Sequence, residues 1–356
     1  MKELTQLQAD ALALLERLVA TPSVSRDEAR TADLLAARLA SYGIATDRLH
    51  NNVYARAARF DAAKPTLLLN SHHDTVRPAA TWTRDPFTPT WEGERLYGLG
   101  ANDAGGSVVA LTAAFRCYYD AELPFNLLLA LSAEEECMGE HGMRALLSEL
   151  GPIDMALVGE PTQMRAAVGE RGLVVLDCTA RGQAGHAARN EGINALYIAA
   201  DDIAWLRGYR FERESPLLGP IGMTATQIEA GAQHNVVPAE CRFVVDVRTT
   251  DAYTNEETVE IVRSHMRSEV APRSTRIRAS AIAPDHPMVG AAAALGVERF
   301  VSPTTSDMAL MPFPSLKMGA GDSARSHTAD EYVLRSEVEQ GVEGYIRYIA
   351  ELAKRY

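Results

Sequence analysis

Three apolar segments of the chain each run directly into acidic or histidine residues. The segments, with the polar groups that follow them, are Thr66–Asn70 with His72 and Asp74, Asn126–Leu131 with Glu134-Glu135-Glu136, and Met155–Val158 with Glu160. In an open α/β sheet the carboxyl ends of the strands form one crevice, so these groups should meet there. Clustered carboxylates are costly to bury unless a cation neutralises them. The pattern therefore predicts a metal site.

His72 and Asp74 are two residues apart, which on an extended segment points both side chains the same way. His72 could ligate a metal while Asp74 orients it from behind. His73 would point to the opposite side, and we interpret it as structural. A polar strand end that faces solvent is the alternative for so short a pattern.

The stretch Gly98-Leu99-Gly100-Ala101-Asn102-Asp103 precedes a helical pattern and has the look of a dinucleotide-binding loop. The third glycine of that motif would fall at Asp103, whose carboxylate would repel a pyrophosphate at the helix N-terminus. As a carboxylate that bridges two metals, Asp103 fits the predicted cluster.

The three adjacent glutamates follow a strongly apolar strand, which favours a site over the alternative, a solvated acidic turn. Adjacent acids suit a division of roles in which one ligates a metal and the other holds a proton for the attacking water. In the second half of the chain His186, Asn235 and Arg248 are uninformative when each is taken alone.

The first half of the chain alternates helices with short apolar strands, which predicts an α/β fold with a mixed, mostly parallel sheet flanked by helices. Helices are expected over 5–20, 27–42 and 107–119. From about residue 172 the pattern changes to half-buried strands over 173–180 and 241–248, with a helix over 193–206 between them. After about residue 282 the α/β character returns, with a strand over 314–318 and a closing helix over 331–354. We therefore expect a discontinuous domain, 1–171 and 282–356, with an inserted α+β domain, 172–281.

Composition limits the function classes. The chain has 356 residues, 47% hydrophobic and 23% charged, as in an ordinary globular protein, and its net charge of −12 gives no support to a nucleic-acid partner. The four cysteines are far apart, which indicates a reducing compartment and no thiolate metal site. No signal peptide or membrane span is recognisable, so a cytoplasmic location without a membrane partner is expected.

Taken together, these motifs resemble the di-zinc metallopeptidase and deacylase family that includes acetylornithine deacetylase, succinyl-diaminopimelate desuccinylase, aminoacylase and glutamate carboxypeptidases. The resemblance runs in family order from Thr21-Pro22-Ser23 to His327-Thr328-Ala329-Asp330-Glu331. It is strongest to acetylornithine deacetylase and to deacylases of acylated citrulline.

The resemblance implies two zinc ions, with cobalt or manganese as alternatives. The roles that it implies are His72 and Glu160 on the first metal, Glu136 and His327 on the second, Asp103 bridging both, Glu135 as general base, Asp74 behind His72, His186 as an oxyanion donor to the partner's active site, and Asn235 and Arg248 on the substrate carboxylate. The family usually has Asp-Glu-Glu where this chain has three glutamates, so a register shifted by one residue is the alternative there.

The implied activity is removal of an N-acetyl or N-succinyl group from an amino acid such as ornithine or citrulline, in arginine biosynthesis. The inserted domain would serve as a lid and dimerise. Within the family, a succinyl-diaminopimelate desuccinylase, a dipeptidase or a carboxypeptidase is the alternative. A non-catalytic metal- or nucleotide-binding protein is the alternative from another class. Polar groups that could recognise the acyl group or side chain are Arg325, Thr304, Thr305 and Asp307.

Overall fold

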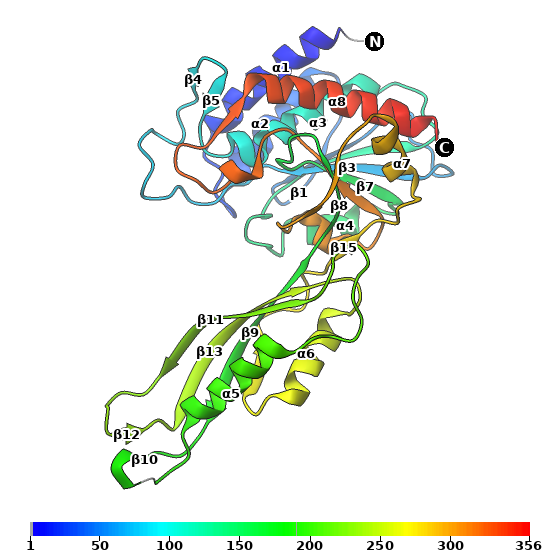
Figure 1. Ribbon diagram of the computed structural model, residues 1–356. Coiled ribbons are helices and arrows are strands. Elements are labelled where there is room, and N and C mark those ends of the chain that lie inside the picture. Colours follow the sequence, from blue (N-terminus) through cyan, green and yellow to red (C-terminus); the bar gives the residue numbers. More distant parts are fainter. Residues whose placement is uncertain (1–2, 190) are drawn as a thin grey trace. The chain divides into compact units, whose positions relative to one another are not determined.

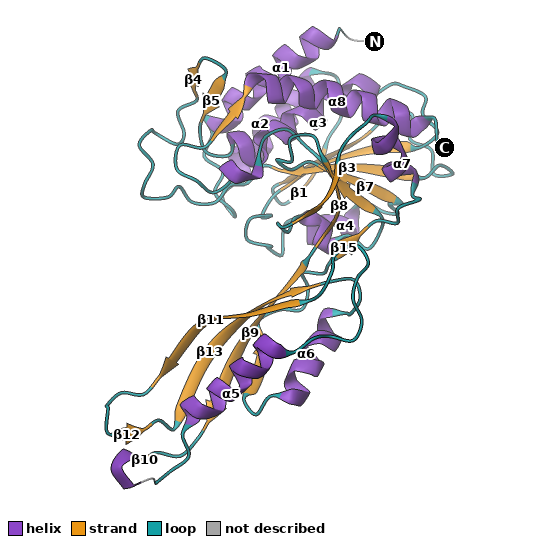
Figure 2. Ribbon diagram, viewed as in Figure 1, coloured by secondary structure: helices purple, strands orange, loops and turns teal. Residues whose placement is uncertain are grey.

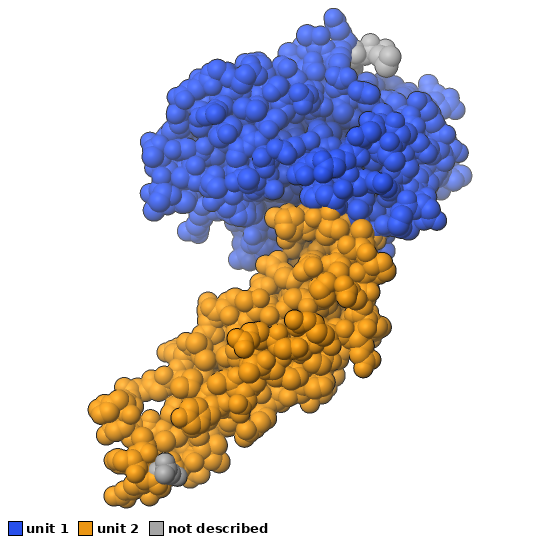
Figure 3. Space-filling model, in the orientation of Figure 1, with its two compact units in different colours: residues 1–168, 282–300, 306–356 blue, residues 169–281, 301–305 orange. Residues whose placement is uncertain are grey.

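The computed structural model describes residues 3–189 and 191–356, which form two compact units (Figure 3). Unit 1 comprises residues 1–168, 282–300 and 306–356, and unit 2 comprises 169–281 and 301–305. The short segment 301–305 is a part of unit 2 that no sequence pattern indicated. The lid and dimerisation roles of the inserted segment stay predictions.

Unit 1 is built on a mixed sheet whose four central strands are parallel, which confirms the predicted α/β fold (Figure 1). The strand order is β1-β2-β6-β3-β7-β17-β8-β15, and β16 also pairs with β8. The bounds are β1 Asp47–Leu49, β2 Asn52–Arg56, β3 Thr66–His72, β6 Asn126–Ser132, β7 Met155–Val158, β8 Ala166–Glu170, β15 Ser280–Ala281, β16 Arg299–Ser302 and β17 Ser315–Lys317.

The parallel strands β3, β6 and β7 are buried along their whole length. Continuous Leu-, Ala- and Val-rich runs are typical of strands that are covered on both faces. Because these strands have no face toward solvent, acidic side chains are placed only where the strands end. The acidic groups are therefore concentrated at one edge of the sheet.

Helices cover both faces of this sheet (Figure 2). α1 (Leu4–Val19), α3 (Gly106–Tyr118) and α8 (Arg335–Ala353) pack together, and α4 (Met143–Glu149) packs with Leu68 and Leu128 on the opposite face. The remaining helices of unit 1 are α2 (Ala29–Ser41) and α7 (Pro287–Ala294).

The closing helix was predicted to begin at Glu331, which is wrong by four residues. Tyr332–Leu334 forms β18 instead, which pairs with β5 (Arg95–Tyr97) in a small sheet that also contains β4 (Thr90–Glu92). Strand pairing with a distant segment therefore overrides the helical pattern here.

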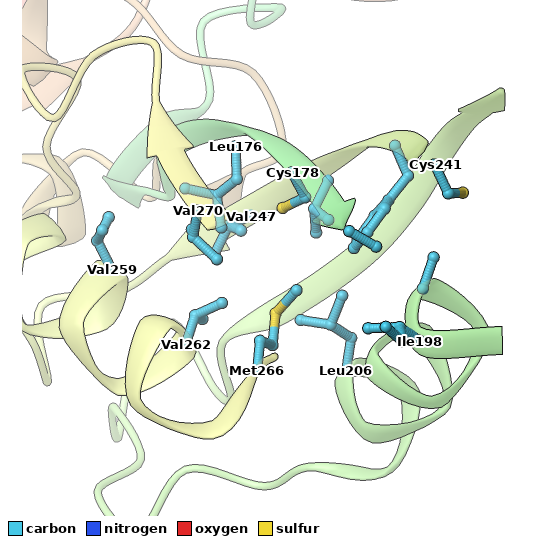
Figure 4. Packing of buried hydrophobic residues seen from close by; sticks show 14 of the residues in the cluster. Leu176, Cys178, Ile198, Leu206, Cys241, Val247, Val259, Val262, Met266 and Val270 are labelled. Carbon is cyan, nitrogen blue, oxygen red and sulfur yellow. The ribbon is translucent and has the colours of Figure 1, made fainter. Parts of the chain in front are cut away.

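Unit 2 contains a four-stranded antiparallel sheet in the order β11-β13-β9-β14. Its strands are β9 Gly172–Arg181, β11 Gly222–Ala230, β13 Glu240–Thr249 and β14 Glu269–Pro272, its helices are α5 Ala195–Gly208 and α6 Asn255–His265, and a small sheet joins β10 Gly185–His186 to β12 Val236–Val237. Leu176 and Val247 from the strands pack against Leu206, Val262 and other residues of the two helices (Figure 4). Alternate residues of β9 and β13 are buried, as expected for strands with one covered face.

None of the helices within residues 3–189 and 191–356 has both the length and the apolar character that crossing a membrane requires.

Candidate metal centre and active site

The ends of the parallel strands bring most of the predicted groups together within unit 1. His72 is the last residue of β3, which pairs in parallel with β6 on one side and β7 on the other. Glu135 and Glu136 follow β6, and Glu160 follows β7. Parallel pairing aligns the three strand ends, so the side chains converge as the sequence pattern predicted.

Two irregular segments supply the other groups. Asp103 lies in the turn Ala101–Gly105 that leads into α3, and His327 lies in the loop before β18. The turn needs glycine at position 98, because a Cβ there would lie 2.1 Å from Val19 Cγ1. The main chain at Gly98 therefore lies directly against Val19 at the end of α1, just before the turn that carries Asp103.

Two potential donor groups result, and they share one residue. His72, Asp103 and Glu160 form the first, Asp103, Glu136 and His327 form the second, and the ligand atoms within each group lie within 4.8 Å of one another. Asp103 Oδ1 is 3.2 Å from His72 Nε2, whereas Asp103 Oδ2 is 3.7 Å from His327 Nε2. One carboxylate thus presents a separate oxygen to each group, as a metal-bridging ligand must.

The hydrogen bond made by His72 Nδ1 determines which ring nitrogen can bind a metal. Nδ1 lies 3.0 Å from the main-chain oxygen of Asp74, and a carbonyl oxygen can only accept, so Nδ1 carries the proton. In the neutral ring Nε2 then offers its lone pair toward Asp103 and toward Glu160, whose Oε1 is 3.7 Å away. This is the arrangement that a ligating histidine requires.

Asp74 holds the turn that carries the glutamates. The carboxylate is fully buried, and its two oxygens accept the main-chain N–H groups of Glu135 at 3.0 Å and Glu136 at 3.2 Å. Ser25 Oγ donates to the same carboxylate at 2.7 Å. Asp74 therefore orients His72 through its main chain and the glutamate turn through its side chain.

The three glutamates point in different directions. Glu134 has a left-handed backbone, with φ of 56°, and its Oε2 accepts the main-chain N–H of His141 at 3.2 Å. Glu136 Oε2 lies 2.9 Å from His327 Nε2, and Glu135 Oε2 lies 4.0 Å from His72 Nε2. The last two glutamates, rather than the first two, reach the cluster.

The electrostatics of the cluster favour a cation. Burial raises the pKa of Glu160 to about 8 and holds the pKa of Glu135 well above its usual range. Burial lowers the pKa of His72, but the carboxylates of Asp103 and Asp74 outweigh it and raise the net pKa well above the usual range. The hydrogen bond that His327 Nε2 donates to the Glu136 carboxylate raises the pKa of His327 to about 9. Two carboxylates with raised pKa values, together with one imidazole in each group, make a donor set that divalent cations accept.

His73 faces away from the donor groups. Its Nε2 lies 3.0 Å from the main-chain oxygen of Asn51, so Nε2 carries the proton and Nδ1 accepts from Thr31 Oγ1 at 2.9 Å. Burial lowers the pKa of His73 to about 4, which keeps this arrangement neutral. The contacts agree with the structural interpretation of this residue.

The three other predicted residues belong to unit 2, and their roles stay predictions. His186 is exposed in β10, and the main-chain oxygen of Asn235 accepts the N–H of Ala187 at 3.1 Å, which keeps His186 and Asn235 close in the fold. Arg248 makes a two-pronged contact with Asp246, at 2.8 and 3.2 Å.

Some residues near the cluster carry no ligand pattern in the sequence. Asp307, one of the candidates for substrate recognition, is buried and accepts from Ser132 Oγ at 2.7 Å, and burial raises its pKa to about 6. Arg325, another candidate, is bound to Glu337 at 2.5 Å. Glu331 was recognised only as the end of a motif, yet its buried carboxylate lies against the Asp103 turn.

Comparison with known proteins gives a consistent result. The profile of peptidase family M20/M25/M40 matches residues 68–351. A protein named succinyl-diaminopimelate desuccinylase from Dinoroseobacter shibae is 32% identical over 280 residues, which cover 74% of this chain and 73% of that protein. One of the same name from Rhizorhabdus wittichii is 31% identical over 290 residues, covering 75% and 74%.

Solved structures share the fold. An aminopeptidase from Bacillus cereus superposes with a TM-score of 0.78 at 18% identity, covering 97% of this chain and 99% of its own. A protein from Bacillus subtilis, described as a dinuclear metal binding peptidase from the M20 family, has a TM-score of 0.72 at 17% identity, with 98% of each chain covered. The family profile and the sequence relatives together show that this chain belongs to peptidase family M20/M25/M40 and is a metal-dependent hydrolase of amide bonds.

Proposed function

We propose that the chain is a two-metal amidohydrolase that removes a short acyl group from an N-acyl amino acid. The carrying observation is the carboxylate of Asp103, which presents one oxygen to each of two donor groups. The first group would hold one divalent ion and the second group the other. A pair of bound ions would polarise the amide carbonyl and lower the pKa of the attacking water toward about 7.

Glu135 is the proton carrier in this proposal. Its carboxylate is buried beside the first donor group and is not a member of either group. Burial raises its pKa, so the carboxylate binds a proton readily once water gives one up. It then passes that proton to the amide nitrogen as the C–N bond breaks, which leaves a free amine and a carboxylic acid.

The substrate would be held by residues of unit 2. His186 would donate a hydrogen bond to the oxygen that becomes negative during attack, and Asn235 and Arg248 would bind the α-carboxylate. Asp246 binds Nε and Nη2 of Arg248, which leaves the other guanidinium N–H groups for a substrate carboxylate. The guanidinium is therefore oriented before substrate arrives.

We favour N-acetyl or N-succinyl derivatives of citrulline or ornithine, with a role in arginine biosynthesis, on the strength of the motif resemblance. N-succinyl-diaminopimelate is the second candidate, because sequence relatives carry the name of its desuccinylase. Both assignments use the same metals and the same proton carrier.

We further propose a homodimer formed through unit 2. β11 is an edge strand whose residues are mostly exposed, including Ile228 at 54%. Leu196 and Tyr197 at the start of α5 are also exposed apolar residues. An unpaired edge flanked by apolar side chains is suited to pairing with a second copy about a two-fold axis.

Metal binding tests the centre itself. The wild-type chain should bind two zinc ions, and Asp103→Ala should bind neither tightly, because both groups lose a ligand. Glu160→Ala should keep the second ion. Stoichiometry measured by elemental analysis after dialysis gives the answer, and Asp251→Ala, an exposed aspartate, is the control. Two ions retained by Asp103→Ala would contradict the bridging role.

Replacement of the proton carrier should separate chemistry from metal binding. Glu135→Gln should keep both ions and lower kcat by about 100- to 10,000-fold, because the side-chain amide of glutamine cannot take up the proton from the attacking water. Glu134→Gln is the matched control and should keep most of the activity, since that side chain binds the loop main chain. The reverse result would assign the base to Glu134 and shift the register by one residue.

A substrate panel tests the proposed specificity. N-acetyl- and N-succinyl-ornithine, citrulline and diaminopimelate should be compared with dipeptides by kcat/KM at saturating zinc. We expect an acyl amino acid to exceed every dipeptide by at least about 100-fold, since a dipeptide carries a charged ammonium on its acyl group that acetyl and succinyl lack, and an unpaired buried charge is costly. A preferred dipeptide would refute the deacylase assignment.

The dimer is tested by sedimentation. Ile228→Asp and Tyr197→Asp should convert the dimer into monomers that keep both metals but lose activity, because His186 would no longer reach the partner's active site. Phe60→Asp, which alters an exposed apolar residue of unit 1, should leave the dimer intact. A fully active monomeric wild type would disprove both the interface and the role of His186.

A further inference from the structure

Glu331 is a buried acid that belongs to neither donor group. It is 2% exposed, and its Oε1 accepts the main-chain N–H of Asn102 at 2.8 Å and that of Asp103 at 2.9 Å. Its main-chain oxygen accepts the N–H of Gly98 at 3.0 Å. One residue therefore fastens both the start of the turn and the residue whose carboxylate the two donor groups share.

The backbone of this turn explains why such an acceptor is needed. Asp103 has φ of −116° and ψ of 98°, and Ala104 has φ of −118° and ψ of 32°, which are not helical values. A buried N–H that has left regular secondary structure must find another acceptor or cost free energy. A single carboxyl oxygen of Glu331 that accepts two consecutive N–H groups satisfies both.

The neighbouring side chain strengthens the anchorage. Asn102 Nδ2 donates to the main-chain oxygen of Asp322 at 3.0 Å, and Asn102 Oδ1 accepts the N–H of Asp322 at 2.9 Å. The turn is thus tied to the segment after β17 through Asn102 and to the segment before β18 through Glu331. These hydrogen bonds hold the main chain at Asn102 and at the N–H of Asp103.

We propose that Glu331 is a positioning residue that aims the Asp103 carboxylate at both metals, an inference that rests on the two-metal function proposed above. The loop 327–331 would then act twice on the centre. It supplies His327 to the second group directly, and through Glu331 it sets the carboxylate that both groups share. Loss of the Glu331 carboxylate would weaken both metal sites without removing a ligand.

The adjacent residue offers a matched control. Asp330 also accepts two consecutive main-chain N–H groups, those of Thr83 at 3.0 Å and Arg84 at 3.1 Å. Neither Thr83 nor Arg84 belongs to the two groups of potential metal ligands. Asp330→Asn keeps the left-handed backbone accessible, since Asn tolerates φ of about 54°. A general effect of losing a loop carboxylate would appear in both positions, whereas a positioning effect would appear only at Glu331.

The experiment measures zinc dissociation constants by chelator competition for wild type, Glu331→Ala, Glu331→Gln and Asp330→Asn. We expect both constants to rise by about 10-fold in Glu331→Gln and about 100-fold in Glu331→Ala, the range for residues that orient ligands. Asp330→Asn should match wild type. The visible absorption of the cobalt-loaded Glu331→Gln protein should also change, since it reports ligand geometry rather than stability.

The outcomes separate this inference from the proposed function. A wild type that binds fewer than two ions would defeat the two-metal assignment itself. A wild type that binds two ions, with Glu331→Gln unchanged in zinc affinity and cobalt spectrum, would overturn the role of Glu331 alone. Equal losses in Glu331→Gln and Asp330→Asn would also overturn it. If Glu331→Ala does not fold, Glu331→Gln carries the test.

Discussion

Repulsion among buried carboxylates is the constraint on which unit 1 depends. Asp103 and Glu135 are buried and the Glu160 side chain is only 13% exposed, so little water reaches these three acids at the ends of strands or in turns. Such a group of like charges is stable only with protons or cations between its members. Burial raises the pKa of Glu160, and the hydrogen bond that His327 donates to Glu136 raises the pKa of His327. On the proposed function, a pair of divalent ions would neutralise these carboxylates and supply the chemistry.

Two buried acids outside the two donor groups, Asp74 and Glu331, make the same kind of contact with the main chain. Asp74 accepts the N–H groups of Glu135 and Glu136, and Glu331 accepts those of Asn102 and Asp103. In each case a buried carboxylate accepts two consecutive main-chain N–H groups, and at least one of the two residues held in this way, Glu135 and Glu136 in the first case and Asp103 in the second, points its own acid at the centre. Because these hydrogen bonds use main-chain N–H groups, they fix the backbone and leave the side-chain carboxylates available to bind metals or protons.

Much of this arrangement was predictable from local pattern. Apolar runs such as Thr66–Asn70 identified the central strands, and His72, Glu136 and Glu160 at or after the ends of those strands lie in the two donor groups. The predicted start of the closing helix was wrong because Tyr332–Leu334 pairs with β5, a strand more than 200 residues away in the chain. The contacts of Glu331 and the Arg248–Asp246 pair were not foreseen, since both depend on where the backbone places a side chain.

All the donor side chains belong to unit 1, whereas His186, Asn235 and Arg248 belong to unit 2. On the proposed assignment, the residues that hydrolyse the amide and the residues that select the substrate belong to separate stretches of the chain. The stretch from Gly169 to Ala281 could then be exchanged between relatives as a cassette, with the reaction preserved and the accepted amide altered.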